Sequence, residues 1–155
     1  LGGVSKGNYD LIRKHYRKLG IKILVDGIPI KPGKPLIIGK LDSKIIFCLP
    51  GNPISSIVCS KLFIVALIKK MLGEKLDSII TRKALLSEDI EVPISQREHY
   101  MRAFTYQKAA TQYVKPFSKQ DSSLHSVLIK SNCLLIIPPG SSSNFKDQIV
   151  DIIDF

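Results

Sequence analysis

The chain has 155 residues, 45% of them hydrophobic, which is enough apolar material for the core of one domain or two small ones. Its 23 Lys and Arg residues exceed its 13 Asp and Glu residues, and the net charge of +10 favours polyanionic partners. No signal peptide is visible, and lysines and serines interrupt the apolar stretch 54–72, which strongly favours a core helix over a membrane span.

The first half of the chain predicts helices alternating with short strands. In chain order we expect a helix over 9–19, a strand over 21–25, a short extended segment over 28–30, strands over 36–38 and 44–49, and a helix over 53–72. Gly73 follows this last helix as a C-cap would, and Lys69 and Lys70 complement the helix dipole in its last turn. A boundary between two architectures is therefore predicted near Gly73.

Beyond Gly73 the periodicity changes to short strands separated by polar or Pro/Gly-rich turns. Strands are predicted over 79–81, 89–92, 100–106, 112–117, 133–137 and 148–153, with one or two helical turns near 122–129. This spacing predicts a small β-barrel.

The most informative segment is the connection from the strand ending at Leu49 to the long helix. The run Ile45-Ile46-Phe47-Cys48-Leu49 predicts a strand buried on both faces, which Pro50 and Gly51 end. Asn52 is a natural N-cap, and Pro53 suits the first helical position. Such a helix N-terminus offers N–H groups and partial positive charge to phosphates and oxyanions. An ordinary strand-to-helix connection remains an alternative.

Two further segments also suit an anion. The glycine-rich loop Gly2-Gly3-Val4-Ser5-Lys6-Gly7 precedes Asn8, a candidate N-cap, and lets backbone amides approach a ligand. The stiff turn Lys31-Pro32-Gly33-Lys34-Pro35 holds two ammonium groups. All three segments fall within the first 55 residues, each near the end of a predicted strand, where ligands bind in open α/β sheets, although each alone is weak evidence.

These motifs carry a family resemblance. They are Gly2-Gly3-Val4-Ser5 with Gly7 and Asp10, Lys31-Pro32-Gly33-Lys34-Pro35, and Leu49-Pro50-Gly51-Asn52-Pro53 with Ser55. In order, spacing and identity they resemble the molybdopterin molybdenumtransferases of the MoeA type, which include the E domain of gephyrin. Gln120-Asp121-Ser122-Ser123-Leu124 with Ser126, and the segment 97–102, are similar to the C-terminal barrel of that family.

The resemblance implies a fold and a reaction. The fold is α/β: the second half of a MoeA-type molybdopterin-binding α/β sandwich over 1–73, followed by a small C-terminal β-barrel over 74–155. The reaction is a step of molybdenum cofactor biosynthesis, in which molybdate is inserted into adenylylated molybdopterin with the help of Mg²⁺ or another divalent metal. The family also implies a cytoplasmic enzyme whose site is completed across a homodimer.

Site residues are implied by the same resemblance. Asp10 matches a functional acid that holds a metal or orients water, and Lys31 matches a basic residue facing the anions. A helix-dipole role for Asp10 is the alternative. The cofactor-binding residues implied are Gly2, Gly3, Ser5, Gly7, Lys34, Pro50, Gly51, Asn52, Pro53 and Ser55.

The chain departs from the family pattern in three ways. Lys6 stands where an apolar residue is usual, and Asp121 replaces a common glycine. The chain also opens at Leu1, inside the expected molybdopterin-binding domain, so we expect a C-terminal fragment that is inactive alone and pairs with the missing portion or a second copy.

Two other functions remain open. The first is a catalytically inactive fragment that keeps cofactor or anion binding, or that dimerises or acts as a scaffold. The second is a nucleic-acid-binding module, which charge alone favours and which the scattered lysines and aromatic residues disfavour.

Cysteines and histidines predict neither disulfides nor metal sites. Cys48, Cys59 and Cys133 lie in apolar surroundings without CxxC spacing and are predicted to be buried free thiols. His15, His99 and His125 lack metal-ligand spacing.

Overall fold

The computed structural model describes residues 11–75, 81–118, 120 and 125–155 of the chain. The chain divides into two compact units, Leu1–Lys75 and Leu76–Phe155, here called the first unit and the second unit.

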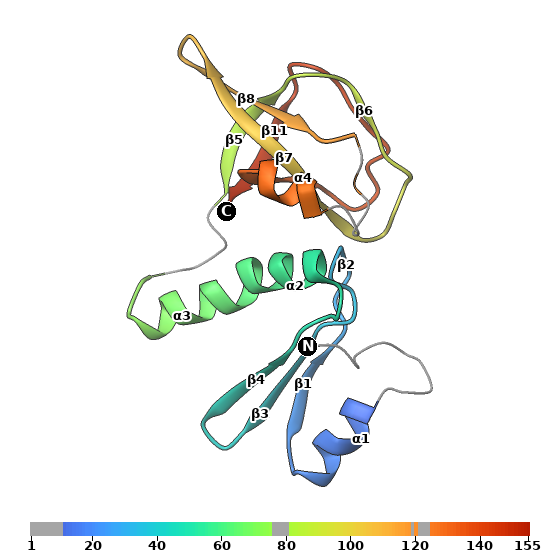
Figure 1. The fold of residues 1–155 in the computed structure, drawn as a ribbon, viewed down its shortest axis with the longest axis vertical. Coiled ribbons are helices and arrows are strands. Elements are labelled where there is room, and N and C mark those ends of the chain that lie inside the picture. The colour runs from blue at the N-terminus through green and yellow to red at the C-terminus, as the bar shows by residue number, and fades with distance from the viewer. Residues whose placement is uncertain (1–10, 76–80, 119, 121–124) are drawn as a thin grey trace. The chain divides into compact units, whose positions relative to one another are not determined.

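The elements follow one another as Figure 1 labels them. In the first unit they are α1 (Leu11–Lys18), β1 (Lys22–Asp26), β2 (Ile30–Lys31), β3 (Ile37–Leu41), β4 (Lys44–Cys48), α2 (Pro53–Cys59), the π-helix η1 (Ser60–Ile64) and α3 (Val65–Met71). In the second unit they are β5 (Arg82–Leu86), β6 (Ile90–Glu91), β7 (Glu98–Lys108), β8 (Thr111–Pro116), α4 (His125–Lys130), β9 (Cys133–Ile137), β10 (Ser143–Asn144) and β11 (Ile149–Asp154).

The first unit contains a three-stranded antiparallel sheet in the order β1-β3-β4. Helix α1 packs on one face of it, where Tyr16 and Ile21 form a buried cluster with Ile37. Gly39 in β3 makes this close packing possible, because a Cβ there would lie 2.7 Å from Ile21 Cγ2. The cluster fixes α1 against the strands that lead to the predicted anion-binding turns.

The prediction that β4 is buried on both faces is wrong. Among the described strands β4 pairs with β3 alone, so it forms an edge of the sheet, and Ile45 is 39% exposed. Local hydrophobicity cannot distinguish an edge strand from a central one, because the position in a sheet depends on which other strands pair with it.

The predicted long helix is present and has an internal irregularity. Its segments α2, η1 and α3 follow one another without a break, and the middle one is π-helical. The helix ends as predicted: Gly73 has φ +89° and its amide donates to Lys70 O at 3.1 Å. Burial is confined to its first part, since Ile54, Val58 and Leu62 are at most 1% exposed and α3 buries no residue. Among the described helices none is long and apolar enough to cross a membrane.

The second unit is a small closed barrel. Its strands follow the order β7-β8-β5-β11-β9, and pairing between β9 and β7 closes the ring. All pairs are antiparallel except β5 with β8. The side chains that fill it include Leu86, Ala103, Val114, Cys133, Leu135 and Ile152, each fully buried.

Three elements of the second unit, β5, β10 and α4, need comment. The predicted strand over 79–81 lies mostly outside the described residues, and the structure has β5 over Arg82–Leu86 instead. Its sequence RKALL has weak β propensity, yet alternate residues Ala84 and Leu86 point into the barrel, so tertiary packing decides the conformation. The short strand β10 was not predicted. The predicted helical turn near 122–129 is α4, whose described part begins at His125.

We predict that Gly39→Ala lowers the free energy of unfolding by about 1–3 kcal/mol, because the new methyl group overpacks the cluster beneath α1. Urea unfolding followed by circular dichroism measures the change. Ser43→Ala, an exposed position in the same β3–β4 hairpin, is the matched control and leaves stability within about 0.5 kcal/mol of wild type. Equal stability of the two variants would contradict the close packing.

Candidate functional site

The start of α2 forms a capped turn, as the sequence predicts. Asn52 has extended φ and ψ angles of −71° and 125°, and its side-chain oxygen accepts a hydrogen bond from the Ser55 amide at 3.2 Å. Pro53 occupies the first helical turn. The Ser56 hydroxyl, which is buried, donates to the Pro50 carbonyl and ties the turn to the helix. The connection from β4 into α2 is therefore rigid.

The capped turn offers fewer free amides than a bare helix terminus. Pro53 has no N–H, the Ser55 amide is bonded to the Asn52 side chain, and the Ser56 amide donates to Asn52 O at 3.0 Å. The helix N-terminus consequently acts on an anion mainly through its partial positive charge.

The second turn, Lys31–Pro35, is held by backbone hydrogen bonds. The Ile28 amide donates to Lys34 O at 2.9 Å, and the Leu36 amide donates to Gly33 O at 3.1 Å. Pro32 follows a cis peptide bond, and Gly33 has φ +125°. Lys31 and Lys34 are both exposed. The turn thus presents two ammonium groups to solvent on a fixed backbone.

These two turns lie at the same end of the sheet. Ile37 at the start of β3 pairs with Cys48 at the end of β4, so the chain enters β3 from one turn where it leaves β4 for the other. The turns also meet through α2, because the Cys59 thiol donates to Gly33 O at 3.7 Å. Figure 1 shows β2 beside the first turn of α2. The structure therefore places Lys31, Lys34 and the segment from Pro50 to Ser55 at the same end of the sheet, and it joins the lysine turn to α2 at Cys59.

The end of β1 lies at this same end of the sheet, since Asp26 pairs with Ile37. Arg13 in α1 holds the Asp26 carboxylate with two bonds from Nε, at 3.0 and 2.9 Å. The positive charge of Arg13 thus offsets the negative charge of Asp26 at the end of the sheet that carries the lysine turn.

The third predicted segment lies outside the described residues. Gly2, Gly3, Ser5, Gly7 and Asp10 all precede Leu11, where the description begins. Lys6 and Asp121 also fall outside it. Their roles remain predictions.

The predicted metal site has no support among the described residues. Within residues 11–75, 81–118, 120 and 125–155 no three His, Cys, Asp or Glu side chains gather as metal ligands. Asp10, the predicted metal-binding residue, is not among them. The described side chains therefore form no site of three or more ligands for a divalent cation, and we assign no chemical step to one.

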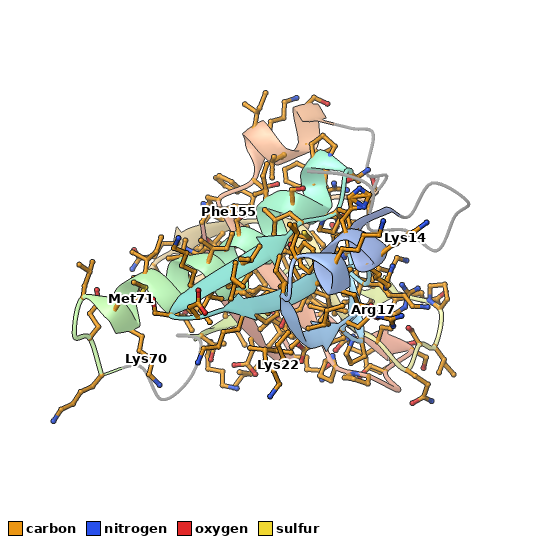
Figure 2. The ribbon with its side chains drawn as sticks, turned by 90° about the horizontal axis from the view of Figure 1, so that it is seen from below. Lys14, Arg17, Lys22, Lys70, Met71 and Phe155 are labelled. Carbon is orange, nitrogen blue, oxygen red and sulfur yellow. The ribbon has the colours of Figure 1, made fainter. Side chains whose placement is uncertain are left out.

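The net charge is distributed unevenly between the two units. The first unit contains fourteen Lys and Arg residues against four Asp and Glu residues, whereas the second contains nine of each. The whole excess of +10 thus belongs to the unit with the candidate site. In Figure 2 the side chains of Lys14, Arg17, Lys22 and Lys70 extend outward from this unit. Its field attracts anions.

All three cysteines are free thiols, as predicted, but only two are buried. Burial raises the pKa of the Cys59 thiol to about 11, and burial with the nearby Asp154 carboxylate raises the pKa of the Cys133 thiol to about 12. Cys48 is half-buried and shares a hydrogen bond with the Tyr16 hydroxyl. Burial and this hydrogen bond both raise the pKa of Tyr16.

In the second unit, a motif glutamine has a structural role. The side chain of Gln120 accepts from the Arg102 amide and donates to the Arg102 carbonyl, both at 3.0 Å, as a neighbouring strand would. Asn132 binds Thr105 in the same way, with bonds of 2.8 and 3.1 Å. The two amide side chains complete backbone pairing along β7.

Sequence reasoning missed the contacts of Ser56 with Pro50 and of Cys59 with Gly33. It also missed the ion pair of Arg13 with Asp26. A weak signal existed for the first two, since Ser56 and Cys59 lie three residues apart and so share one face of the helix that follows the motif. No signal in the sequence pairs Arg13 with Asp26.

Comparison with known proteins agrees with this architecture. A family described as a probable molybdopterin binding domain matches residues 1–70, and one described as the MoeA C-terminal region (domain IV) matches residues 84–155. The chain is 26% identical to a molybdopterin molybdenumtransferase of Bacillus subtilis over 98% of its length, and 32% identical to that of Haemophilus influenzae over 99%. It covers 35% and 38% of these two relatives, about a third of their length.

A solved structure shows the same likeness. The crystal structure of a molybdopterin biosynthesis MoeA protein from Pyrococcus horikoshii is 27% identical and superposes with a TM-score of 0.76, covering 94% of this chain and 34% of that one. The predicted fold class, part of a molybdopterin-binding α/β domain followed by a small barrel, is confirmed.

The fold and motifs together thus define an α/β domain of the molybdopterin-binding type joined to a barrel. The chain belongs to the MoeA family of molybdopterin molybdenumtransferases, and it matches the C-terminal portion of its relatives.

We predict that Asn52→Ala lowers the free energy of unfolding by about 1 kcal/mol, because the Ser55 amide loses its acceptor. Asn52→Ser keeps an acceptor at the N-cap and stays within a few tenths of a kcal/mol of wild type. Urea unfolding measures both, and equal losses for the two variants would contradict the capping role.

The buried thiols lead to a reactivity prediction. At pH 8 we expect iodoacetamide to modify Cys48 in the folded protein and to leave Cys59 and Cys133 intact. In urea all three cysteines should be modified, and mass spectrometry of peptides measures both results.

Because folding raises the Cys59 pKa from 9.0 to about 11, the folded state keeps a proton that the unfolded state releases. Its contribution to stability is complete below pH 9 and falls as the pH rises toward 11.

Proposed function

We propose that the chain is the C-terminal portion of a molybdopterin molybdenumtransferase and that its first unit binds the anionic groups of the substrates, adenylylated molybdopterin and molybdate. The observation that carries the proposal is the contact of the Lys31–Pro35 turn with α2 through Cys59, at the end of the sheet where β4 leads into that helix. Support also comes from the confinement of the net positive charge to this unit.

In this proposal each described residue has a physical task. Lys31 and Lys34 neutralise phosphate or molybdate oxygens, and Lys31 also stabilises negative charge that develops during transfer. Asn52 and Pro53 fix the helix N-terminus, whose partial charge adds to that of the lysines. Pro50, Gly51 and Ser55 shape the backbone around it. Asp10 and the glycine loop from Gly2 to Gly7 complete the site.

The reaction proposed is the insertion of molybdate with loss of the adenylate. The two thiols of molybdopterin bond to molybdenum as two molybdate oxygens leave with the thiol protons as hydroxide, and the oxidation state of molybdenum does not change. Water cleaves the phosphoanhydride bond, which releases AMP and leaves the phosphate on molybdopterin. A requirement for Mg²⁺ stays a prediction from the family resemblance, with Asp10 as its proposed ligand.

We further propose that residues beyond this chain complete the catalytic site. The chain spans about a third of the length of its relatives, and the proposed partners are the remaining portion or a second copy in a homodimer. Because the chain spans only about a third of the length of its relatives, a second candidate function is a module that binds the cofactor or an anion without turnover, or that dimerises. A cytoplasmic location stays a prediction.

Isothermal titration with AMP and with molybdate tests the proposal on the full 155-residue chain. We predict that Lys31→Met and Lys34→Met each weaken binding by about three- to tenfold at low salt, because each removes one charge from the turn. Lys70→Met, an exposed position on α3, makes the same change in net charge and leaves the affinity within about twofold.

Equal effects of the three substitutions would mean that only the overall field attracts the anions. Failure of the wild-type chain to bind either probe would contradict the proposal. Tight, salt-sensitive binding to RNA or DNA instead would favour the nucleic-acid alternative.

A further inference from the structure

One face of α2 contacts both turns of the candidate site. Ser56 and Cys59 lie three residues apart, so their side chains project from the same side of the helix. The Ser56 hydroxyl donates to the Pro50 carbonyl at the start of the helix, and the Cys59 thiol donates to the Gly33 carbonyl in the lysine turn. The two turns are thus fixed to a common rigid element.

The contact at Cys59 is one of close packing as well as hydrogen bonding. A Cβ built on Gly33 would lie 2.8 Å from both Cys59 Sγ and Ile30 Cδ1, a distance that real Cβ atoms do not occupy. The thiol and the isoleucine therefore fill the space that a side chain at position 33 would need. Gly33 and Cys59 are both buried, and Cys59 is 0% exposed.

We propose that Cys59 is a positioning residue: through Gly33 it holds the Lys31–Pro35 turn, and with it the two lysine ammonium groups, at a fixed place relative to the start of α2. This inference rests on the proposed anion-binding function and names a residue outside the motifs that serves it.

The size of the thiol suits this task. A methyl group in its place would leave a void beside the Gly33 carbonyl and remove the donor, so the turn would gain freedom to move. A larger side chain would push the turn outward, because Gly33 offers no side chain that could yield. A serine hydroxyl fits the space and donates to a carbonyl more strongly than a thiol does.

Amide hydrogen exchange of the ¹⁵N-labelled full chain, followed by NMR, tests the contact without any ligand. In Cys59→Ala we expect the amides of Ile28 and Leu36, which bond within the turn, to exchange about tenfold faster or more. Cys59→Ser restores most of the protection. Cys133→Ala removes another fully buried free thiol, located in the barrel, and leaves these two amides unchanged.

Titration of the same variants with AMP and with molybdate gives the second measurement. Cys59→Ala is expected to weaken binding by about fivefold or more, because the lysines are no longer held in place before the anion arrives. Cys59→Ser and Cys133→Ala bind within about twofold of wild type. Thermal melts of all three variants show whether the two alanine variants lose comparable stability.

The outcomes separate this inference from the proposed function. Unchanged exchange of Ile28 and Leu36 in Cys59→Ala overturns the positioning role, as does faster exchange with unchanged affinity. Equal losses of affinity in Cys59→Ala and Cys133→Ala also overturn it, because the effect would then follow stability alone. If wild type binds neither probe, the proposed function fails, and exchange still decides whether Cys59 holds the turn.

Discussion

The candidate site depends on the close approach of α2 to the Lys31–Pro35 turn. No side chain separates them, because position 33 is glycine and the Cys59 sulfur occupies the space where a Cβ would lie. The same helix is anchored to its own leading turn by Ser56 and capped by Asn52. Two segments nearly twenty residues apart in sequence are thereby held at one end of the sheet.

Charge and geometry reinforce each other in the first unit. Its fourteen basic residues create a field over the whole unit, while the turn fixes only two of them, Lys31 and Lys34, at the end of the sheet where β4 leads into α2. A field of this kind speeds the encounter with any anion, and fixed groups are what give selectivity. Arg13 balances Asp26 at the same end of the sheet, so the local potential stays positive.

The barrel has a different physical character. It is electrically neutral and is closed by pairing between β7 and β9, with its interior filled by aliphatic side chains. Where strand neighbours end, Gln120 and Asn132 bond to the backbone of β7 through their side-chain amides. The motif glutamine therefore maintains the barrel, whereas the motif lysines face solvent.

The sequence by itself determined what local chemistry controls: the cap at Asn52, the stop at Gly73, the long helix after Pro53, the change to short strands beyond it, and the motifs that mark the family. Tertiary structure decided the rest. That β4 is an edge strand, that RKALL is a strand of the barrel, that α3 buries no side chain and that Cys59 contacts Gly33 all depend on contacts between segments distant in the chain. Such contacts leave no local pattern, because hydrophobic periodicity reports that a residue is buried and not which residue covers it.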